Sequence, residues 1–275
     1  MRFWKYHGLG NDFIVVENFD QTVSKDPEFV RKMCDRHFGI GADGILYVEK
    51  DCLCDARMVV MNSDGSEAEM CGNGIRCVAK HLYDNWFVRS KSMSINTLAG
   101  QKSIDVTVHN GLVESVVVGM GAPHLDRKDV PMKGDGQFVD AELSVEDKKI
   151  RGTAVSMGNP HLIIFQDLEA DEVEELGPLL ERHASFPKRT NVEFVKFVNG
   201  VLEVKVFERG AGWTMACDTG ACATAVAAAV LGKVPFEKEV EVRLPGGSLW
   251  ITVSRDLSNV KMRGPAVLVY RAATE

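Results

Sequence analysis

Short runs of apolar and β-branched residues recur along the whole chain and are separated by turn-forming residues. Such runs predict strands, here at residues 13–17, 45–49, 57–61, 104–108, 113–118, 162–165, 192–198, 202–207, 240–244 and 249–253. Four segments have helical character instead, at 27–37, 72–83, 170–183 and 219–231. The strands and helices do not alternate strictly, so the pattern predicts an α+β fold and not a doubly wound sheet.

The two halves of the chain share landmarks at nearly one spacing. The offset is 148 residues for Asn11 and Asn159, 148 for Asp43 and Asn191, and 146 for Asn62 and Glu208. Each member of the last pair stands nine residues before a cysteine, at Cys71 and Cys217. We infer two homologous halves that meet near residues 119–123, with one active site between them. The predicted domains are residues 1–118 with 264–275, and residues 119–263.

Both cysteines open similar phrases, Cys71-Gly72-Asn73-Gly74 and Cys217-Asp218-Thr219-Gly220. Each phrase places a thiol on a glycine-bearing turn at a predicted helix start, where unpaired backbone N–H groups and the helix dipole favour negative charge. Such a setting lowers the pKa of a thiol and makes it a usable acid, base or nucleophile. A single cysteine there is more often a small core residue. The duplicated placement favours two thiols that act on one carbon from opposite sides.

Other polar residues surround these phrases. Asn11, Asn62, Asn159 and Asn191 stand at strand entrances or turns, where turn chemistry alone explains many asparagines. Their repetition favours a ring of amides around an amino acid, and Glu208-Arg209 adds a carboxylate and a guanidinium that suit its ammonium and carboxylate. His161, next to this ring, is a candidate to orient a thiol or accept its proton. The amides of Gly72, Asn73, Asp218 and Thr219 are candidates to hold the reacting carboxylate.

Composition narrows the possible functions. The chain of 275 residues carries a formal charge of −7 with its lysines and arginines scattered, which disfavours nucleic acid as a partner. It contains no run near the ~20 apolar residues of a membrane helix, so we expect a soluble, cytoplasmic protein. Its odd number of cysteines suits a reducing compartment. Cys34, Cys52, Cys54 and His37 match no common zinc spacing, and we expect neither a metal nor a cofactor.

Together these phrases resemble the cofactor-independent diaminopimelate epimerases. The resemblance spans nearly the whole chain, in family order, and is carried by residues 10–13, 39–44, 62–66, 70–76, 158–161, 189–194, 208–212 and 217. It implies two similar halves, each a curled, largely antiparallel and barrel-like sheet around a central helix, and commonly a homodimer. It implies interconversion of LL- and meso-2,6-diaminopimelate in lysine biosynthesis.

The resemblance also implies roles for the candidate residues. Cys71 and Cys217 correspond to the two acid/base thiols, and His161 and Glu208 to their assistants. The substrate-binding positions it implies are Asn11, Asn62, Gly72, Asn73, Asn159, Asn191, Glu208, Arg209, Asp218 and Thr219.

One residue departs from the family pattern, because Asp218 stands where glycine is usual. Either its side chain points away and caps the helix, or it signals an altered substrate. Two other functions stay open from the sequence. One is a racemase of the same fold that acts on another amino acid, and the other is a noncatalytic amino-acid-binding protein.

Overall fold

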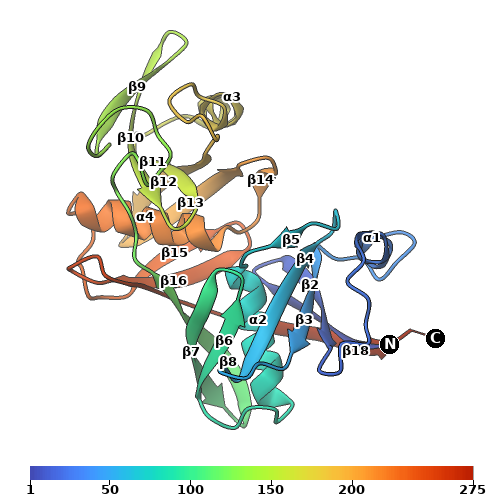
Figure 1. The fold of residues 1–275 in the computed structure, drawn as a ribbon. Coiled ribbons are helices and arrows are strands. Elements are labelled where there is room, and N and C mark those ends of the chain that lie inside the picture. The colour runs from blue at the N-terminus through green and yellow to red at the C-terminus, as the bar shows by residue number, and fades with distance from the viewer. Residues whose placement is uncertain (275) are drawn as a thin grey trace. The chain divides into compact units, whose positions relative to one another are not determined.

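The computed structural model describes residues 1–274, and the chain divides into two compact units (Figure 1). Unit 1 comprises Met1–Gly119 and the described residues from Arg263 onward, and unit 2 comprises Met120–Met262. The chain therefore builds most of unit 1, then all of unit 2, and supplies a last strand to unit 1. That last strand, β18 (Val267–Ala273), pairs antiparallel with the first, β1 (Arg2–Gly8).

Unit 1 contains a curled sheet. Its other strands are β2 (Asn11–Glu17), β3 (Gly44–Glu49), β4 (Ala56–Asn62), β5 (Glu67–Ala68), β6 (Ser92–Thr97), β7 (Gly100–His109) and β8 (Leu112–Gly121). The pairs β1–β2, β3–β4, β4–β5, β6–β7 and β7–β8 are antiparallel, whereas β2–β3 and β4–β6 are parallel. Because β2 and β3 are parallel, their N-terminal ends lie at the same edge of the sheet.

Unit 2 repeats this scheme. Its strands are β9 (Ala141–Val145), β10 (Lys148–Ser156), β11 (Pro160–Ile164), β12 (Asn191–Val198), β13 (Val201–Glu208), β14 (Gly212–Thr214), β15 (Val240–Leu244), β16 (Gly247–Val253) and β17 (Val260–Gly264). The pairs β9–β10, β10–β11, β12–β13, β13–β14 and β15–β16 are antiparallel, whereas β11–β12 and β13–β15 are parallel. The pairings from β10 to β16 thus reproduce those from β1 to β7, in the same order and sense.

The strand register refines the sequence alignment of the halves. Phe13 pairs with Gly44 in unit 1, and His161 pairs with Asn191 in unit 2. Because His161 lies two residues after Asn159 as Phe13 lies two after Asn11, the counterpart of Asn191 is Gly44. The sequence comparison with Asp43 was therefore wrong by one residue.

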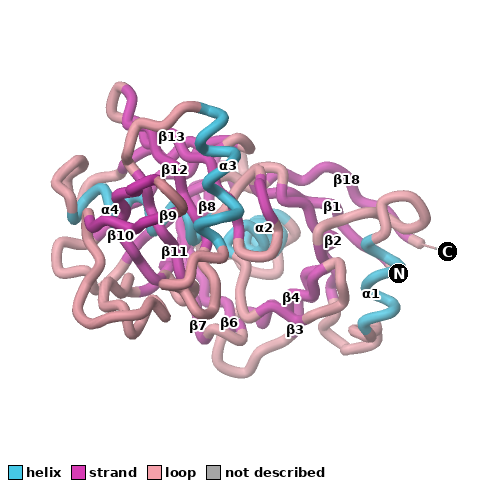
Figure 2. The backbone as a smooth tube through the Cα atoms, turned by 90° about the horizontal axis from the view of Figure 1, so that it is seen from above, coloured by secondary structure: helices cyan, strands magenta, loops and turns pink. Residues whose placement is uncertain are grey.

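Each sheet curls around one helix. In unit 1, α2 (Gly72–Asp84) contacts β1, β2, β3, β4 and β7. In unit 2, α4 (Asp218–Val230) contacts β10, β11, β12, β13, β15 and β16 (Figures 1 and 2). Every residue of α4 from Gly220 to Ala229 is buried, because its alanine-rich sequence combines high helix propensity with side chains small enough for strands to approach on all sides. These two central helices position the candidate thiols.

Two shorter helices lie outside the central positions. α1 (Pro27–Cys34) begins with a proline after the capping residue Asp26. It ends three residues before the expected His37, because the Asp35 carboxylate accepts hydrogen bonds from the backbone N–H groups of His37 and Phe38 and folds that segment into a turn. α3 (Ala170–Glu181) begins with a capping box, formed by Glu169 and Glu172.

All the predicted strands are present, within a few residues of the expected limits, and the structure adds β1, β5, β6, β9, β10, β14, β17 and β18. Several of these carry charged residues on one face. Lys5 in β1, for example, is buried and satisfied by the Gly41 carbonyl and the Asp12 carboxylate. A buried lysine of this kind interrupts the apolar pattern on which strand prediction depends.

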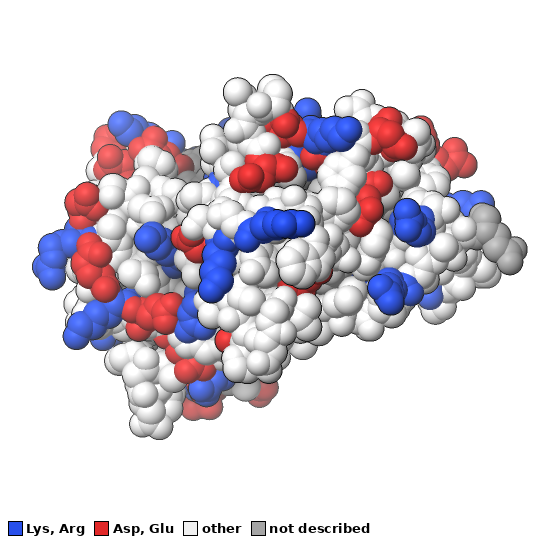
Figure 3. Space-filling view, turned by 90° about the horizontal axis from the view of Figure 1, so that it is seen from below, with Lys and Arg blue, Asp and Glu red and all other residues white. Residues whose placement is uncertain are grey.

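The surface carries both signs of charge. On the face shown in Figure 3, lysine and arginine side chains are interspersed with aspartate and glutamate. None of the helices among the described residues has the length and apolar character needed to cross a bilayer.

Candidate active site

Cys71 and Cys217 occupy the same structural position in their units. Each is the N-cap of the central helix, with φ −139° and ψ 118° at Cys71 and φ −127° and ψ 111° at Cys217. Each sulfur accepts a backbone N–H from three residues along, at 3.3 Å from Gly74 N and 3.4 Å from Gly220 N. A thiol therefore replaces the hydroxyl or carboxylate that usually caps a helix. The dipole at both helix starts favours negative charge on the sulfur.

The glycine that donates to each sulfur is closely packed. A Cβ at Gly220 would lie 2.7 Å from Glu193 Oε1 and 3.2 Å from Cys217 Sγ, and one at Gly74 would lie 3.0 Å from Leu46 Cδ2. The register makes Leu46 and Glu193 counterparts, since they pair with Val15 and Ile163 respectively. A buried leucine thus packs against the glycine that donates to Cys71, and a buried glutamate packs against the glycine that donates to Cys217.

The surroundings of Cys71 are mainly amides. Cys71 Sγ donates to Asn11 Oδ1 at 3.7 Å, and Asn73 Nδ2 donates to the same oxygen at 3.2 Å. Asn11 Nδ2 in turn donates to Asp43 Oδ2 at 2.8 Å, which fixes the orientation of the Asn11 amide. Asn73 is held from the other side by Arg76 Nη2, which donates to Asn73 Oδ1 at 2.6 Å. The structure thus brings together three of the expected residues of unit 1, namely Asn11, Cys71 and Asn73.

The remaining expected residues of unit 1 lie close by in the fold. Gly72 is buried at the first position of α2. Asn62 ends β4 opposite Gly44, and its exposed side chain donates to Ser66 Oγ at 3.0 Å. Asn62 is therefore at the same sheet edge as Asp43, and its side-chain hydrogen bond is made within its own turn. 

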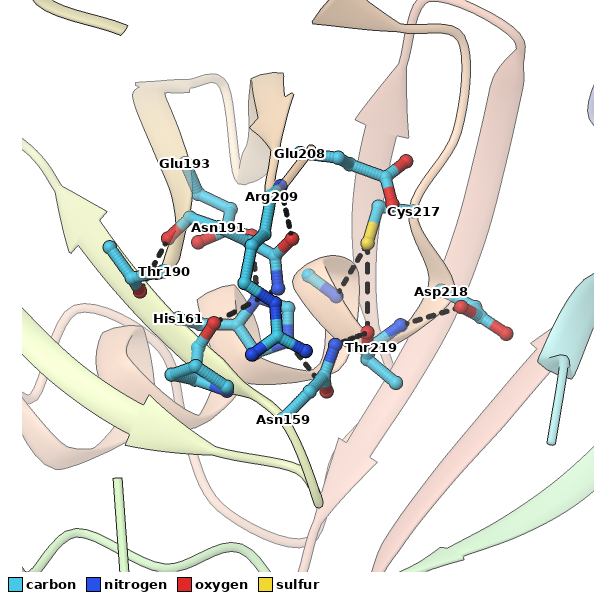
Figure 4. A network of polar contacts seen from close by, with 12 residues as sticks. Asn159, His161, Thr190, Asn191, Glu193, Glu208, Arg209, Cys217, Asp218 and Thr219 are labelled. Atoms are coloured by element: carbon cyan, nitrogen blue, oxygen red, sulfur yellow. Dashed lines mark hydrogen bonds and ion pairs between the residues drawn. The ribbon is translucent and has the colours of Figure 1, made fainter. Parts of the chain in front are cut away.

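In unit 2 a chain of polar contacts leads to Cys217 (Figure 4). Asn159 Nδ2 donates to Thr219 Oγ1 at 3.2 Å, and that hydroxyl lies 3.6 Å from Cys217 Sγ. Because the Thr219 oxygen accepts from Asn159, its own proton is available to the sulfur. Two donors, the Gly220 amide and the Thr219 hydroxyl, therefore face Cys217.

His161 and Glu193 form a buried pair that extends this chain. Both side chains are completely inaccessible, and His161 Nδ1 lies 2.6 Å from Glu193 Oε1. The other ring nitrogen, Nε2, lies 3.0 Å from Asn159 Oδ1. Sequence reasoning missed Glu193, although an acidic residue inside the apolar run Val192–Val195 was the available signal.

Glu208 stands beside Cys217 and shares its buried environment (Figure 4). Its Oε1 accepts a hydrogen bond from Thr214 Oγ1 at 2.5 Å. Burial raises the pKa of Glu208, and the nearby Asp218 charge raises it further. Burial also raises the pKa of the Cys217 thiol well above its usual value, with added contributions from the charges of Glu208, Asp218 and Glu193. In the substrate-free state these influences favour a protonated Cys217.

Asn191 and Arg209 form an adjoining contact. Asn191 Oδ1 accepts from the Arg209 backbone N–H at 2.9 Å, and Asn191 Nδ2 donates to the Pro160 carbonyl at 2.9 Å. The Arg209 guanidinium donates to the Lys188 carbonyl at 3.2 Å and is otherwise exposed. Figure 4 shows this guanidinium on the same side of the network as Asn159. Its exposed positive charge is suited to bind a carboxylate.

The Asp218 carboxylate is hydrogen-bonded to the first turn of α4. Its Oδ1 accepts the Thr219 backbone N–H at 2.9 Å, while its Oδ2 is buried and, among the described residues, lacks a hydrogen-bond partner. The side chain therefore engages one of the two amides of α4 that were expected to hold a substrate carboxylate. Within residues 1–274, no three histidine, cysteine or acidic side chains gather in a way that could hold a metal ion.

Solved structures with this fold include amino-acid epimerases and racemases. A hydroxyproline epimerase from Agrobacterium vitis has a TM-score of 0.72 at 15% identity, with 99% of this chain and 90% of that one covered. A phenazine biosynthesis protein of the PhzF family from Bacillus anthracis has a TM-score of 0.71 at 17% identity, with 100% and 99% covered. This likeness shows the fold, in which each unit of this chain carries a central helix capped by a cysteine.

Sequence comparison identifies the family to which the chain belongs. The family model for diaminopimelate epimerase matches residues 3–125 and 153–269. Diaminopimelate epimerases from Moorella thermoacetica and Methanococcus maripaludis are 46% and 43% identical, and each alignment covers 98% of this chain and 98% of the relative. This chain belongs to the diaminopimelate epimerase family.

Proposed function

We propose that this protein interconverts LL- and meso-2,6-diaminopimelate by moving a proton at one α-carbon between two thiols. The observation that carries the proposal is the duplicated helix cap. Cys71 and Cys217 have nearly the same backbone conformation, and each accepts the N–H of the glycine three residues along. Family membership supplies the substrate. The assignment places the protein in lysine biosynthesis.

The reaction is balanced by an exchange of protons. One cysteine, as thiolate, removes the α-hydrogen as a proton, and the C–H electron pair passes into the substrate carboxylate as an enediolate. The other cysteine, as thiol, delivers its proton to the opposite face of the same carbon. The configuration inverts, and the two cysteines exchange protonation states. The reverse reaction uses them in the opposite roles.

The enediolate needs donors that are already in place when its charge develops. We assign this role to the backbone amides at the two helix starts, from Gly72 and Asn73 in α2 and from Asp218 and Thr219 in α4. The dipoles at these helix starts favour an anion, and in the substrate-free chain the Thr219 N–H is engaged by the Asp218 carboxylate. No metal ion or organic cofactor has a part in the proposed steps.

Glu208 and His161 assist Cys217. The Glu208 carboxyl next to the thiol has a pKa raised by burial, so it holds a proton more readily than an exposed glutamate does. His161 acts through Asn159 and Thr219, which face the sulfur. Glu208 can take up the proton that the buried thiol gives up, and His161 helps to hold the donor that faces the thiolate.

Recognition of diaminopimelate needs contacts to its second amino-acid centre, which does not react. We assign these contacts to Asn62, Asn159, Asn191 and the Arg209 guanidinium, with the Glu208 carboxylate available for an ammonium group. Asn11 lies beside Cys71 and contacts the reacting centre. Amides, a carboxylate and a guanidinium together match the mixed charges of an amino acid.

We also propose a homodimer in the cytoplasm. The support for the dimer is the outer strand β18, where Val267, Leu268, Val269 and Tyr270 are between 42% and 55% exposed. Four consecutive apolar residues on one strand favour contact with a second copy of the chain. Sedimentation velocity checks this assembly, with Tyr270→Asp expected to yield monomer.

The function is tested with purified LL-diaminopimelate in deuterated water. We expect deuterium to enter at an α-carbon together with formation of the meso isomer, as read by proton NMR and chiral chromatography. Equal exchange on a different amino acid, with none on diaminopimelate, would identify a racemase of other specificity. Binding of diaminopimelate by calorimetry without any exchange would identify a noncatalytic binding protein.

A further inference from the structure

The buried pair His161–Glu193 has a built-in comparison in the other unit. By strand register the counterparts of His161 and Glu193 are Phe13 and Leu46. Phe13 is 3% exposed, and Leu46, like both members of the polar pair, is fully buried. The same fold position is thus filled by two apolar side chains in unit 1 and by two ionisable ones in unit 2.

Placing an ionisable pair at this buried position costs free energy, and the fold itself does not require such a pair. Burying ionisable groups is unfavourable, and an apolar pair of similar volume is often equally stable or more stable. Glu193 is also incompletely satisfied, because its Oε2 is buried without a hydrogen-bond partner among the described residues. Since unit 1 shows that Phe and Leu satisfy the packing, the polar pair calls for a functional explanation.

The hydrogen bonds around the ring determine its protonation. Asn159 directs its Nδ2 to Thr219, so its Oδ1 faces His161 Nε2 and can only accept a proton from it. Glu193 Oε1 faces the opposite nitrogen at 2.6 Å, a short distance typical of a charge-assisted bond. With an acceptor facing each nitrogen, the contacts suit an N–H on both, which is the hydrogen-bond pattern of an imidazolium paired with a carboxylate. Glu208 on β13 is a further charged group near this ring.

The geometry points to Glu193 as a positioning residue for Cys217: it holds His161 as an imidazolium, which fixes the Asn159 amide so that the Thr219 hydroxyl faces the sulfur. In this scheme donation runs from His161 to Asn159, from Asn159 to Thr219, and from Thr219 to the Cys217 thiolate. Glu193 itself touches neither the sulfur nor substrate in this scheme. This inference rests on the proposed function for its kinetic consequence, but not for its structural one.

Glu193→Gln removes the charge and keeps the shape. The glutamine amide can donate to His161 Nδ1, so the ring no longer needs its second proton. We expect the ring nitrogens of His161, followed by ¹⁵N NMR of histidine-labelled protein at pH 7, to change from both protonated to Nε2 protonated only. We expect kcat to fall about 10- to 100-fold, part of the contribution of a positioned acid or base, with KM within about threefold.

Glu49→Gln is the matched control. Glu49 is a buried glutamate on β3, the counterpart strand of β12, where it accepts from Asn18 Nδ2 at 3.0 Å and pairs with Lys25 Nζ at 2.8 Å. We expect this variant to leave the His161 ring signals and kcat unchanged. The comparison separates loss of a buried carboxylate in general from loss of the one beside His161.

The double variant His161→Phe/Glu193→Leu places the apolar pair of unit 1 into unit 2. We expect a thermal midpoint equal to or above that of the wild type, together with a loss of turnover at least as large as in Glu193→Gln. That combination separates function from folding, because a pair needed only for structure would give a lower midpoint.

The inference is overturned if His161 keeps both ring protons in Glu193→Gln, if kcat stays within about threefold, or if neither variant folds. If the wild-type protein shows no turnover of diaminopimelate, the proposed function fails. The NMR comparison of Glu193→Gln with Glu49→Gln still decides the positioning role, because it needs no substrate.

Discussion

The ends of the two central helices have nearly the same backbone but very different surroundings. Cys71 is half-buried and faces the amides of Asn11 and Asn73, whereas Cys217 is 4% exposed and has Glu208, Asp218 and Glu193 close enough to raise its pKa. The duplication therefore supplies the geometry of two thiols, and the substituted side chains supply a difference between them. An epimerase benefits from such a difference, because one thiol must be charged while the other is protonated.

The largest test of this comparison removes each thiol in turn. In Cys71→Ser and Cys217→Ser a hydroxyl oxygen replaces the sulfur as the helix cap, so the fold should persist. Each should lower kcat about 1,000-fold or more, because a serine hydroxyl is a poor acid and base near neutral pH. Deuterium exchange and chiral chromatography give the rates, and Cys52→Ser, at an exposed loop cysteine, serves as the control. Turnover within tenfold of wild type in either variant would refute the two-thiol mechanism.

Chemical modification tests the difference between the thiols directly. At pH 8, iodoacetamide should modify Cys71 about tenfold faster or more than Cys217, because a pKa raised by one unit lowers the thiolate fraction tenfold and Cys217 is less exposed. The rate at Cys217 should go on rising at pH values above those at which an ordinary thiol has ionised. Mass spectrometry of the two peptides from one sample gives both rates. Equal rates would show that the carboxylates do not distinguish the thiols.

The glycines under the two sulfurs test the packing difference. Gly74→Ala should change the free energy of unfolding little, because the helix gains about 1 kcal/mol in propensity and the flexible end of Leu46 can give way. Gly220→Ala should destabilise by about 1–3 kcal/mol, because its Cβ would meet Glu193 Oε1 and Cys217 Sγ. Urea denaturation measures both. The reverse order of stability would contradict the assignment of Leu46 and Glu193 as counterparts.

The smallest expected effect concerns Asp218. Asp218→Gly should free the Thr219 amide for the substrate and remove a charge that raises the pKa of Cys217 and Glu208. We expect KM to fall about two- to fivefold, as for a helix-terminus charge worth 0.3–1 kcal/mol, and the acidic limb of activity to move to lower pH. Asp218→Asn removes the charge alone and should reproduce the pH shift. Unchanged kcat, KM and pH profile in both variants would leave Asp218 as a helix cap only.

Local signals in the sequence were sufficient for much of the fold. The four helices were predicted because proline, capping residues and glycine turns mark their starts, and Cys71 and Cys217 were found because their phrases repeat. β1 and β10 were not predicted, since Lys5 and the lysines that open β10 interrupt the apolar pattern. The two-unit α+β fold, with one central helix in each unit, is confirmed by the structure and by solved relatives.

Long-range contacts account for what the sequence did not reveal. Glu193 was missed because its partner His161 lies on a neighbouring parallel strand. The register between two strands cannot be predicted from the sequence of either strand alone. The equivalence of Asp43 and Asn191 was off by one for the same reason, because the connection from β11 to β12 is one residue shorter in register than that from β2 to β3. The contact of Asp218 with Thr219 depends on a side-chain rotamer, which composition and spacing do not specify.

The pairing of β18 with β1 has a consequence for biosynthesis. Strand β1 leaves the ribosome before any part of unit 2, and its partner β18 leaves after all of unit 2. Unit 2 is one uninterrupted stretch of sequence, so it can complete its hydrogen bonding while β1 still waits for β18. Vectorial synthesis thus favours folding of the Cys217 half first, with the β1–β18 pairing of the Cys71 half delayed until β18 has emerged.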